Sequence, residues 1–309
     1  MSTPRHFDAA AIAAALPPRA AVDAIAEALA DFDPAADITR AIVPLARGEF
    51  LLMPAEVGGA AGVKVATVAP GNPEMGLPRI QASYLLFDVA TLSLQATFDG
   101  TALTTLRTPA VSLAAVRPTL DRFAEPLRVV VFGAGPQALG HVETLAAISA
   151  HPLASVTFLV RQPSRATPRA ADLGEVAGVD GPSAPAALRN AHVVICSTTA
   201  RTPLFPANAI REDAVVIAIG SHEPAARELD GALMARSTVI VEDLATALRE
   251  PGDVIIARDE GRLAPDDLVP MRAVITGNVT IPRDRPVVFK SVGMSWQDLV
   301  TARAVVRES

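Results

Sequence analysis

The order of apolar and polar residues changes character along the chain, and each part predicts different elements. Residues 9–31 carry apolar residues at helical spacing, interrupted at Pro17-Pro18, which predicts two helices. From about residue 35 to 105, apolar stretches alternate with turn formers. Strands are expected there at AIVPL (41–45), EFLLMPA (49–55), GVKVATV (62–68), IQASYLLFDV (80–89) and SLQATFDG (93–100). We expect these strands to form a mostly antiparallel sheet.

A helix is expected to follow this sheet in the stretch LTTLRTPAVSLAAVRPTL, residues 103–120. Thr108 is suited to cap its start, because a threonine hydroxyl can accept from a free amide in the first turn. Pro109 then falls at the first helical position, where its missing N–H costs nothing.

Past Pro126, short apolar strands alternate with helical stretches. The strands are RVVVFG (128–133), SVTFLV (155–160), HVVICST (192–198), AVVIAIG (214–220) and STVIVED (237–243). Runs of Val and Ile with helices between them predict a parallel, doubly wound sheet. The chain ends in a strand, a turn and a helix, and we expect that helix to return to the first domain. The prediction is therefore an α/β protein with a Rossmann-type domain, 121–287, inserted into an α+β domain made of 1–120 and 288–309.

Size, charge and cysteine content narrow the class of protein. A chain of 309 residues is long enough for two domains of ordinary size. Its net charge of −6 gives a nucleic acid no electrostatic attraction, and the apolar runs fall short of the roughly 20 residues that cross a bilayer. Cys196 cannot form an internal disulfide and has no metal-ligand cluster beside it, which favours a reducing compartment. We expect a cytoplasmic protein that binds neither nucleic acid nor membrane.

The stretch RVVVFGAGPQALGH contains the dinucleotide-binding pattern G-x-G-x-x-A between a strand and a helix. Gly133 permits the tight turn, Gly135 lets the backbone approach a pyrophosphate, and Ala138 lets the helix pack closely on the strand. Pro136 and Gln137 complete the loop at the helix N-terminus, where the free amides attract phosphate. This context predicts a bound dinucleotide.

The second strand of the same domain indicates which dinucleotide. NAD enzymes usually end this strand with an acid that bonds the ribose 2′-hydroxyl. Here the strand runs into FLVRQPSR, with Arg161 and Arg165 and no acid. Two cations suit a 2′-phosphate, so NADP(H) is favoured and NAD(H) remains the alternative. Thr198 and Thr199, which follow the third predicted strand, are expected to contact the ribose or the nicotinamide.

Lysine is rare in this sequence. Of 27 basic residues, Lys64 and Lys290 are lysine and the rest are arginine. A lysine can lower its pKa in a desolvated, cation-rich pocket and exchange a proton, whereas arginine stays charged. Lys64 is therefore a candidate for acid–base chemistry. Lys290, in VFKSVG, is equally well explained by packing.

Several motifs, in order, resemble the ornithine cyclodeaminase/mu-crystallin family: FLLMPA, GVKVATVAPGNPEMGLP, TFDGTALTTLRTPAVSLAA, VFGAGPQA, GSHEPAAREL and VFKSVG. The resemblance covers about residues 38–300. It implies hydride transfer at a carbon that bears a nitrogen and a carboxylate. It also implies a homodimer, with the nucleotide domain inserted into a substrate-binding and dimerisation domain.

The resemblance assigns residues to the site. Arg40, Lys64 and Arg107 match positions that line the substrate site, and Met53 matches the methionine of the family's Met-Pro step. Thr108 resembles the residue that meets the cofactor phosphates. The turn from Ser291 to Gly293 resembles the one that closes over the nicotinamide.

One departure separates the branches of the family. Cyclodeaminases carry an aspartate where this chain has His222, with Glu223 beside it. Histidine can act in acid–base chemistry but is a poor partner for an ammonium group. We therefore expect a reductase of cyclic imino acids, such as Δ1-pyrroline-2-carboxylate or Δ1-piperideine-2-carboxylate, in which Lys64, Arg107 and His222 are catalytic. The alternatives are ornithine cyclodeaminase, an alanine-type amino acid dehydrogenase, or a family member that binds a ligand without turnover.

Overall fold

A computed structural model describes residues 3–309, apart from the side chain of Pro73. The chain forms two compact units. One comprises Met1–Val111 and Gly293–Ser309, and the other comprises Ser112–Val292. We call them the outer unit and the nucleotide unit. Their boundaries lie at 111/112 and 292/293, whereas the sequence pattern placed them at 120/121 and 287/288.

The outer unit is built on a six-stranded sheet in the order β1-β6-β5-β4-β3-β2. Its strands are β1 (Arg5–Phe7), β2 (Ala41–Leu45), β3 (Gly48–Val57), β4 (Ala60–Val68), β5 (Ile80–Asp88) and β6 (Leu94–Asp99). Neighbours are antiparallel except β1, which runs parallel to β6. The five strands expected from the sequence are present. Strand β1 is too short to show an alternating pattern.

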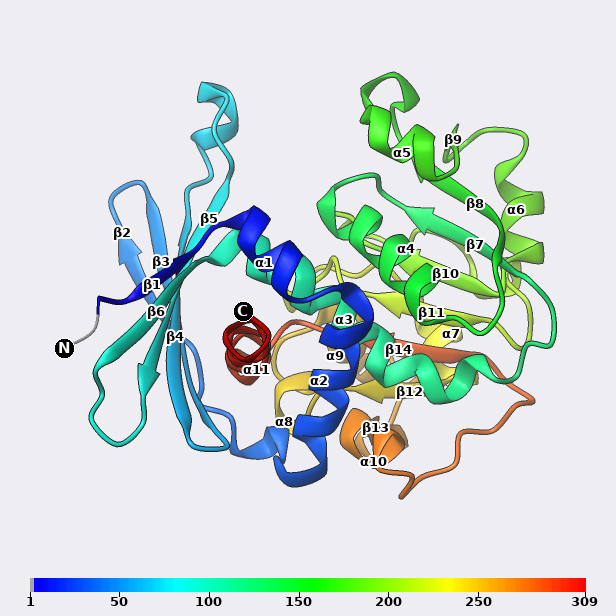
Figure 1. Ribbon diagram of the computed structural model, residues 1–309. Coiled ribbons are helices and arrows are strands. Elements are labelled where there is room, and N and C mark those ends of the chain that lie inside the picture. The colour runs from blue at the N-terminus through cyan, green and yellow to red at the C-terminus, as the bar shows by residue number, and fades with distance from the viewer. Residues whose placement is uncertain (1–2) are drawn as a thin grey trace. The chain divides into compact units, whose positions relative to one another are not determined.

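Helices cover one face of this sheet. The helices are α1 (Ala9–Ala15), α2 (Pro18–Asp31) and the C-terminal α11 (Ser295–Arg307). The unit also contains the short turns η1 (Pro34–Ala36) and η2 (Asn72–Met75), of which η2 lies in the connection between β4 and β5. In Figure 1, α11 lies against the sheet, and it contacts β3, β4 and β5. The Asp8 carboxylate caps α1, and Pro18 occupies the first position of α2. The predicted return of the final helix to the first domain is confirmed.

No single helix among residues 3–309 is long and apolar enough to cross a membrane. Helices α1 and α2, bent by 74° at their junction, meet that length and composition test only as a pair.

The helix after the sheet, α3 (Gly100–Leu120), starts earlier than the sequence suggested. The Asp99 carboxylate accepts from the amides of Thr101 and Ala102 and so caps the helix. Thr108 is therefore inside the helix, where its hydroxyl donates to the carbonyl of Thr104, and its assignment as the cap was wrong. Pro109 removes one helix hydrogen bond, but burial of most residues from 107 to 116 outweighs that loss.

The nucleotide unit contains an eight-stranded parallel sheet in the order β13-β12-β14-β11-β10-β7-β8-β9. Its strands are β7 (Leu127–Phe132), β8 (Leu153–Val160), β9 (Glu175–Gly178), β10 (Val193–Cys196), β11 (Val215–Ala218), β12 (Thr238–Val241), β13 (Leu268–Pro270) and β14 (Val287–Lys290). Between them lie α4 (Pro136–Ile148), α5 (Pro168–Leu173), α6 (Ala184–Asn190), α7 (Gly231–Arg236), α8 (Leu244–Ala247), α9 (Gly252–Asp259) and α10 (Met271–Ile275). The short turns are η3 (Pro163–Arg165), η4 (Ala207–Ala209) and η5 (Pro265–Asp267). The predicted doubly wound α/β fold is confirmed.

Strand β14 corrects the predicted division at residue 288. It lies between β11 and β12 in the parallel sheet, so residues up to 290 belong to this sheet and not with the C-terminal helix. Val287, Val288 and Phe289 are all fully buried. An apolar strand of this kind is covered on both faces only inside such a sheet.

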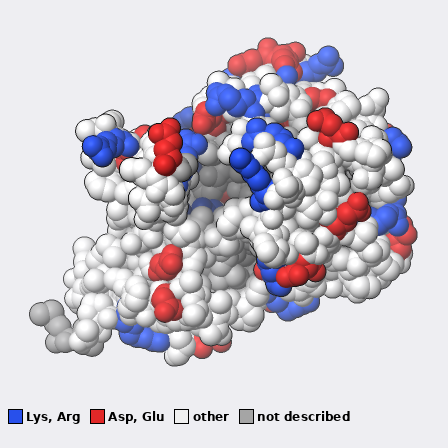
Figure 2. Space-filling model, turned by 90° about the horizontal axis from the view of Figure 1, so that it is seen from above, with Lys and Arg blue, Asp and Glu red and all other residues white. Residues whose placement is uncertain are grey.

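Arginine supplies the basic groups of the surface. Figure 2 shows Lys/Arg and Asp/Glu side chains interspersed over the face in view. Ion pairs such as Arg169–Glu143 and Arg201–Glu223 join exposed side chains. Lys64 and Lys290 are instead 4% and 1% exposed, and each pairs with a fully buried aspartate. The two lysines of the chain are thus both interior residues.

Candidate active site

Lys64 occupies the middle of β4, on the sheet face that the helices cover. It is directly opposite Met53 on β3 and Tyr84 on β5. Side chains directly opposite one another on antiparallel strands share a face. Met53, Lys64 and Tyr84 are all buried, so the predicted substrate residues Met53 and Lys64 lie side by side.

Asp298, on α11, connects Lys64 to Arg107. Its Oδ2 is 2.8 Å from Lys64 Nζ, and its Oδ1 is 3.4 Å from Arg107 Nε. Arg107 also donates from Nη1 to Oε1 of Gln297, at 2.7 Å. Thr104 Oγ1 lies 3.5 Å from Lys64 Nζ. Helix α3, helix α11 and strand β4 therefore bring one acid and two cations together in the interior.

Arg40 and Gly293 belong to the same group of residues. Arg40 donates from Nη2 to the Gly293 carbonyl, at 2.6 Å. Gly293 has a φ of +80°, and a Cβ there would lie 2.7 and 2.9 Å from the two terminal nitrogens of Arg107. Glycine is required by both the backbone conformation and the space. Gly293, which the family resemblance assigned to the cofactor, thus contacts two of the predicted substrate residues.

The charges of this cluster change the acidity of Lys64. Burial lowers the pKa of Lys64 from 10.5 to about 8; Asp298 opposes that shift, and Arg107 and Arg40 add to it. Lys64, Arg107 and Arg40 are three cations, and Asp298 and Asp37 are the two carboxylates that act on this cluster, so the cations outnumber the acids and favour a further anion. A pKa near 8 also lets the ammonium lose and regain a proton close to neutral pH.

Tyr84 adds a hydroxyl that the sequence did not point to. Its Oη is buried and has no hydrogen-bond partner among the described residues. Burial raises the pKa of Tyr84, and the charges of Asp298 and Asp37 raise it further. A side chain at Gly62 would collide with Tyr84 Oη, so this glycine makes room for the ring. The hydroxyl stays protonated and can donate to a ligand.

In the nucleotide unit, the residues after β7 fit a dinucleotide phosphate. Gly133 has a φ of +101°, and a Cβ there would lie 2.8 Å from the Ser197 carbonyl oxygen. Gly135 is exposed, with open space where a side chain would be. It precedes α4, whose first position is Pro136 and whose start has no side-chain cap. Ala138 is fully buried against the sheet. The free amides of a 13-residue helix are therefore open to an anion.

The other predicted cofactor residues differ in exposure and in their contacts. Arg161 and Arg165 are exposed directly after β8, and Thr199 is exposed after β10. Thr198 and Ser291 use their hydroxyls within the protein, donating to Glu228 and Glu242 respectively. Gln137 follows Pro136 in the first turn of α4 and is half-buried, whereas Thr108 is buried in α3.

His222 is in the exposed loop after β11. Its neighbour Glu223 is also exposed, and its Oε2 is 2.8 Å from Arg201 Nη1. Glu223, the other residue considered for the cyclodeaminase acid, is therefore already paired with a cation. Ser221 fixes the start of the loop by donating to the Ala226 carbonyl.

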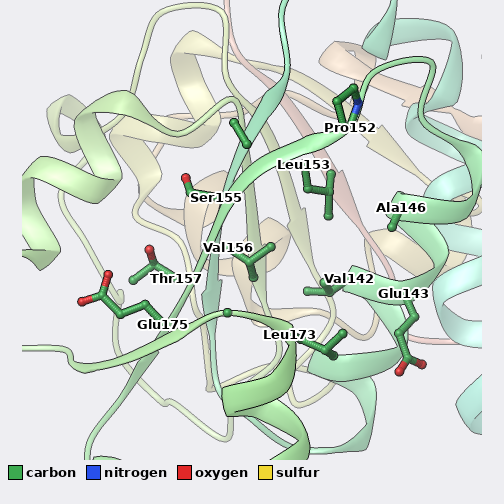
Figure 3. A pocket seen from close by; sticks show the side chains of 12 residues that line it. Val142, Glu143, Ala146, Pro152, Leu153, Ser155, Val156, Thr157, Leu173 and Glu175 are labelled. Atoms are coloured by element: carbon green, nitrogen blue, oxygen red, sulfur yellow. The ribbon is translucent and has the colours of Figure 1, made fainter.

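A pocket of about 860 Å³ lies elsewhere in the nucleotide unit. Figure 3 shows Val142, Leu153, Val156 and Leu173 at its centre and Glu143 to one side. Its wall includes residues 153–157, the amino-terminal part of β8, which pairs with the start of β7. Ligands of such sheets bind beyond the carboxyl ends of the strands, so this pocket is separate from the glycine loop.

The sequence pattern did not indicate Asp298 and Gln297, nor the buried acids Glu228 and Asp253. All four are fully buried. In SWQDLVTA, the acid falls in the first turn of a helix, where a carboxylate is usually explained by the helix dipole. The detectable signal was its apolar surroundings, because a charged side chain among core residues needs a partner.

The chain is similar to proteins of one family. A model of the ornithine cyclodeaminase/mu-crystallin family matches residues 8–309. The Δ1-pyrroline-2-carboxylate/Δ1-piperideine-2-carboxylate reductase of Azospirillum brasilense is 32% identical over 302 residues, 96% of this chain and 93% of that protein. Mouse ketimine reductase mu-crystallin is 32% identical over 271 residues, 86% of this chain and 83% of its own.

Among solved structures, Thermococcus litoralis Δ1-pyrroline-2-carboxylate reductase, in complex with NADH and L-proline, superposes with a TM-score of 0.85. Its sequence identity is 23%, with 98% of this chain and 97% of that chain covered. At this identity the likeness shows a shared fold. Together with the family match over nearly the whole sequence, it leads to one conclusion: the chain belongs to the ornithine cyclodeaminase/mu-crystallin family.

Proposed function

We propose that the protein is an NAD(P)H-dependent reductase of cyclic imino acids, namely Δ1-pyrroline-2-carboxylate or Δ1-piperideine-2-carboxylate. The observation that carries this proposal is the group of buried Lys64 and Arg107 with half-buried Arg40 around Asp298. Such a substrate presents one carboxylate beside a C=N bond, which matches an anion site with a proton donor in it. The reductases named among the relatives act on the same class of compound.

The substrate carboxylate binds to the cations. Arg107 presents a planar guanidinium that can hold two carboxylate oxygens at once. Arg107 is fixed by Gln297 and Asp298, so its orientation is set before the substrate arrives. Holding the carboxylate fixes the direction of the neighbouring imine carbon, and such positioning contributes much of the rate in a transfer reaction.

Lys64 supplies the proton that reduction of the imine requires. With a pKa of about 8, it is mostly protonated at neutral pH but gives up its proton far more readily than an exposed lysine. Asp298 holds the ammonium by a direct hydrogen bond of 2.8 Å. Lys64 therefore protonates the substrate nitrogen, while Asp298 sets the position and the acidity of the donor.

The reduced nicotinamide cofactor supplies the hydride. Gly133, Gly135 and the start of α4 would hold its pyrophosphate. Arg161 and Arg165 favour NADP(H), because both are exposed at the end of β8, where a ribose 2′-phosphate is bound in this fold. NAD(H) is the alternative.

Cyclodeamination of ornithine is the second candidate, and the loop after β11 weighs against it. That reaction needs an acid for the side-chain amine, and His222 stands at the matching position. Glu223 is paired with Arg201. His222 is proposed to take part in proton exchange during imine reduction.

The test is cofactor oxidation, followed at 340 nm, with Δ1-pyrroline-2-carboxylate and Δ1-piperideine-2-carboxylate as substrates. Ornithine with either form of the cofactor, and pyruvate with ammonia, are run beside them. We expect turnover with a cyclic imine and little ammonia from ornithine. Robust formation of proline and ammonia from ornithine would instead identify the protein as an ornithine cyclodeaminase. Turnover of pyruvate with ammonia alone would indicate an amino acid dehydrogenase.

Assembly as a homodimer is part of the proposal. Large apolar side chains of the outer unit are exposed, including Ile42, Val43 and Leu45 on β2 and Ile80 on β5. A second copy would cover such strands. Light scattering at micromolar concentration should give twice the 32.1 kDa chain mass, and a mass of one chain would contradict this. A cytoplasmic location is likewise proposed, since Cys196 is a free, buried thiol.

A further inference from the structure

Glu228 is a fully buried acid whose side chain joins two loops of the nucleotide unit. Its Oε1 accepts from the backbone N and from Oγ1 of Thr198, both at 2.8 Å. Its Oε2 accepts from the backbone N of Gly220, at 2.8 Å. Thr198 lies just beyond the end of β10, and Gly220 lies just beyond the end of β11. One carboxylate therefore fixes the chain where two neighbouring parallel strands end.

The loops joined by Glu228 also touch one another and the glycine loop. A side chain at Gly220 would collide with the Thr198 backbone and with Glu228 itself. A Cβ at Gly133 would lie 2.8 Å from the Ser197 carbonyl oxygen. The segments after β7, β10 and β11 are thus in close backbone contact, in the order in which their strands lie in the sheet. A shift of the Thr198 segment would therefore displace the turn at Gly133, which is expected to bind phosphate.

A second layer of charge fixes Glu228 itself. Asp253 on α9 accepts through Oδ1 from the backbone amides of Glu228 and Leu229, at 2.7 and 2.9 Å. Its Oδ2 is 3.1 Å from Nζ of Lys290, at the end of β14. Burial raises the pKa of Glu228, and the positive charge of Lys290 acts against that rise. Lys290 thereby supports two buried carboxylates at once.

We propose that Glu228 is a positioning residue for the nicotinamide cofactor, which holds the segments after β10 and β11 in the conformation that receives it, with Asp253 and Lys290 as its support. The inference rests on the proposed function, because it presumes a dinucleotide beyond the carboxyl ends of these strands. It gives Lys290 a role distinct from that of Lys64. It also leaves the Thr198 hydroxyl less able to bond the cofactor directly, because that hydroxyl donates to Glu228 and accepts from the Ala200 amide. Thr199 is the side chain left for direct contact.

The first test is Glu228→Gln, with affinity for NADPH and NADH measured by fluorescence titration without substrate. The Glu228 carboxylate faces three donors, namely the backbone N and Oγ1 of Thr198 and the backbone N of Gly220. Glutamine replaces one carboxylate oxygen by an NH2 group, which cannot accept a hydrogen bond from any of them. One loop must therefore lose its acceptor. A hydrogen bond to a charged group is strong enough that we expect the cofactor Kd to rise by about tenfold or more.

Asp230→Asn is the matched control. Asp230 lies two residues along the same loop and accepts from the backbone amides of Ala207 and Leu233. It should lose a similar amount of stability in urea and keep the wild-type cofactor Kd. If Glu228→Gln also keeps that Kd, within twofold, the inference is wrong. If the wild-type protein binds neither NADPH nor NADH, the proposed function fails and this inference fails with it.

A pair of variants at Thr198 decides the matter even if Glu228→Gln does not fold. Thr198→Ser keeps the hydroxyl and should bind cofactor normally, whereas Thr198→Val should bind about fivefold more weakly. In Glu228→Gln, adding Thr198→Val should cause a smaller loss than it does in the wild-type protein, because Glu228 and Thr198 share a contact. Equal affinity of the Ser and Val variants, or additive losses in the double variant, would overturn the proposal.

Discussion

Replacing Asp298 by Asn should move the pH at which the enzyme loses activity. Asp298 is the group in direct contact with Lys64 that keeps its ammonium protonated, with 2.8 Å between Nζ and Oδ2. Asparagine has nearly the same shape and keeps an oxygen acceptor, but it carries no charge. Arg107 and Arg40, which both lower the pKa of Lys64, stay in place. The substitution therefore removes the negative charge that raises the pKa of Lys64 and leaves the two positive charges that lower it.

The size of the effect follows from the charges on the two residues. With Asp298 present, the pKa of Lys64 is about 8. An opposite charge at this range shifts a pKa by about 1–3 units, so in Asp298→Asn the pKa of Lys64 should fall by at least about one unit. Lys64 must be protonated to donate, so activity is lost as pH rises through its pKa. The alkaline limb of kcat/KM should move from near pH 8 to lower pH.

The measurement is kcat/KM for the cyclic imine between pH 5.5 and pH 9.5, in a buffer of constant ionic strength. Thr301→Val is the control, since Thr301 is buried on the same helix and its hydroxyl donates only to the Gln297 carbonyl. That variant should lose some stability and keep the wild-type limb. An alkaline limb in Asp298→Asn that stays in place, or moves to higher pH, would refute the assignment of Lys64 as the proton donor.

Three further predictions test separate parts of the account. Lys64→Arg keeps the charge but cannot exchange a proton, so its turnover number at saturating imine should fall about 10²-fold while NADPH affinity is unchanged; near-normal turnover would leave Lys64 as a point charge. Changing Arg161 and Arg165 together to Ala should raise the KM for NADPH and barely alter that for NADH, and an unchanged preference would rule out their contact with the 2′-phosphate. Burial lowers the pKa of His141 from 6.5 to about 4, so the unfolded chain binds the extra proton first as pH falls below 6.5. His141 should account for about 2 kcal/mol of the stability lost between pH 7 and pH 5 in urea unfolding, and His141→Gln should lose that share; an equal slope in both proteins would contradict it.

The sequence predicted most of the strands, because most stretches of Val, Ile and Leu in this chain are buried on at least one face; β2, which is exposed along its length, is an exception. It did not predict the start of α3. There, a threonine followed by proline imitates a helix start, and the true cap, Asp99, lies in the stretch that was assigned to the preceding strand. Burial outweighed the low helix propensity of proline: Pro109 is tolerated within α3 because the residues around it are packed in the interior. The predicted boundary at 287/288 falls inside β14 for a related reason, since pairing partners far along the chain leave no local signal.

For the site, the rarity of lysine led to Lys64, and the family pattern led to Arg40 and Arg107. Neither approach found Asp298, because its role depends on α11 returning to the sheet more than two hundred residues after Lys64. The sequence pattern likewise did not indicate Glu228. Its function as an acceptor for three donors is visible only when the ends of β10 and β11 are side by side.

The most direct test of the central claim follows the hydride itself. The protein is incubated with Δ1-pyrroline-2-carboxylate and NADPH or NADH carrying deuterium on both positions of nicotinamide C4, and the product is analysed by mass spectrometry and NMR. The account predicts proline with one deuterium at Cα, formed at the rate at which the cofactor is oxidised. Proline without deuterium, or cofactor oxidation without proline, would contradict hydride transfer to the C=N carbon.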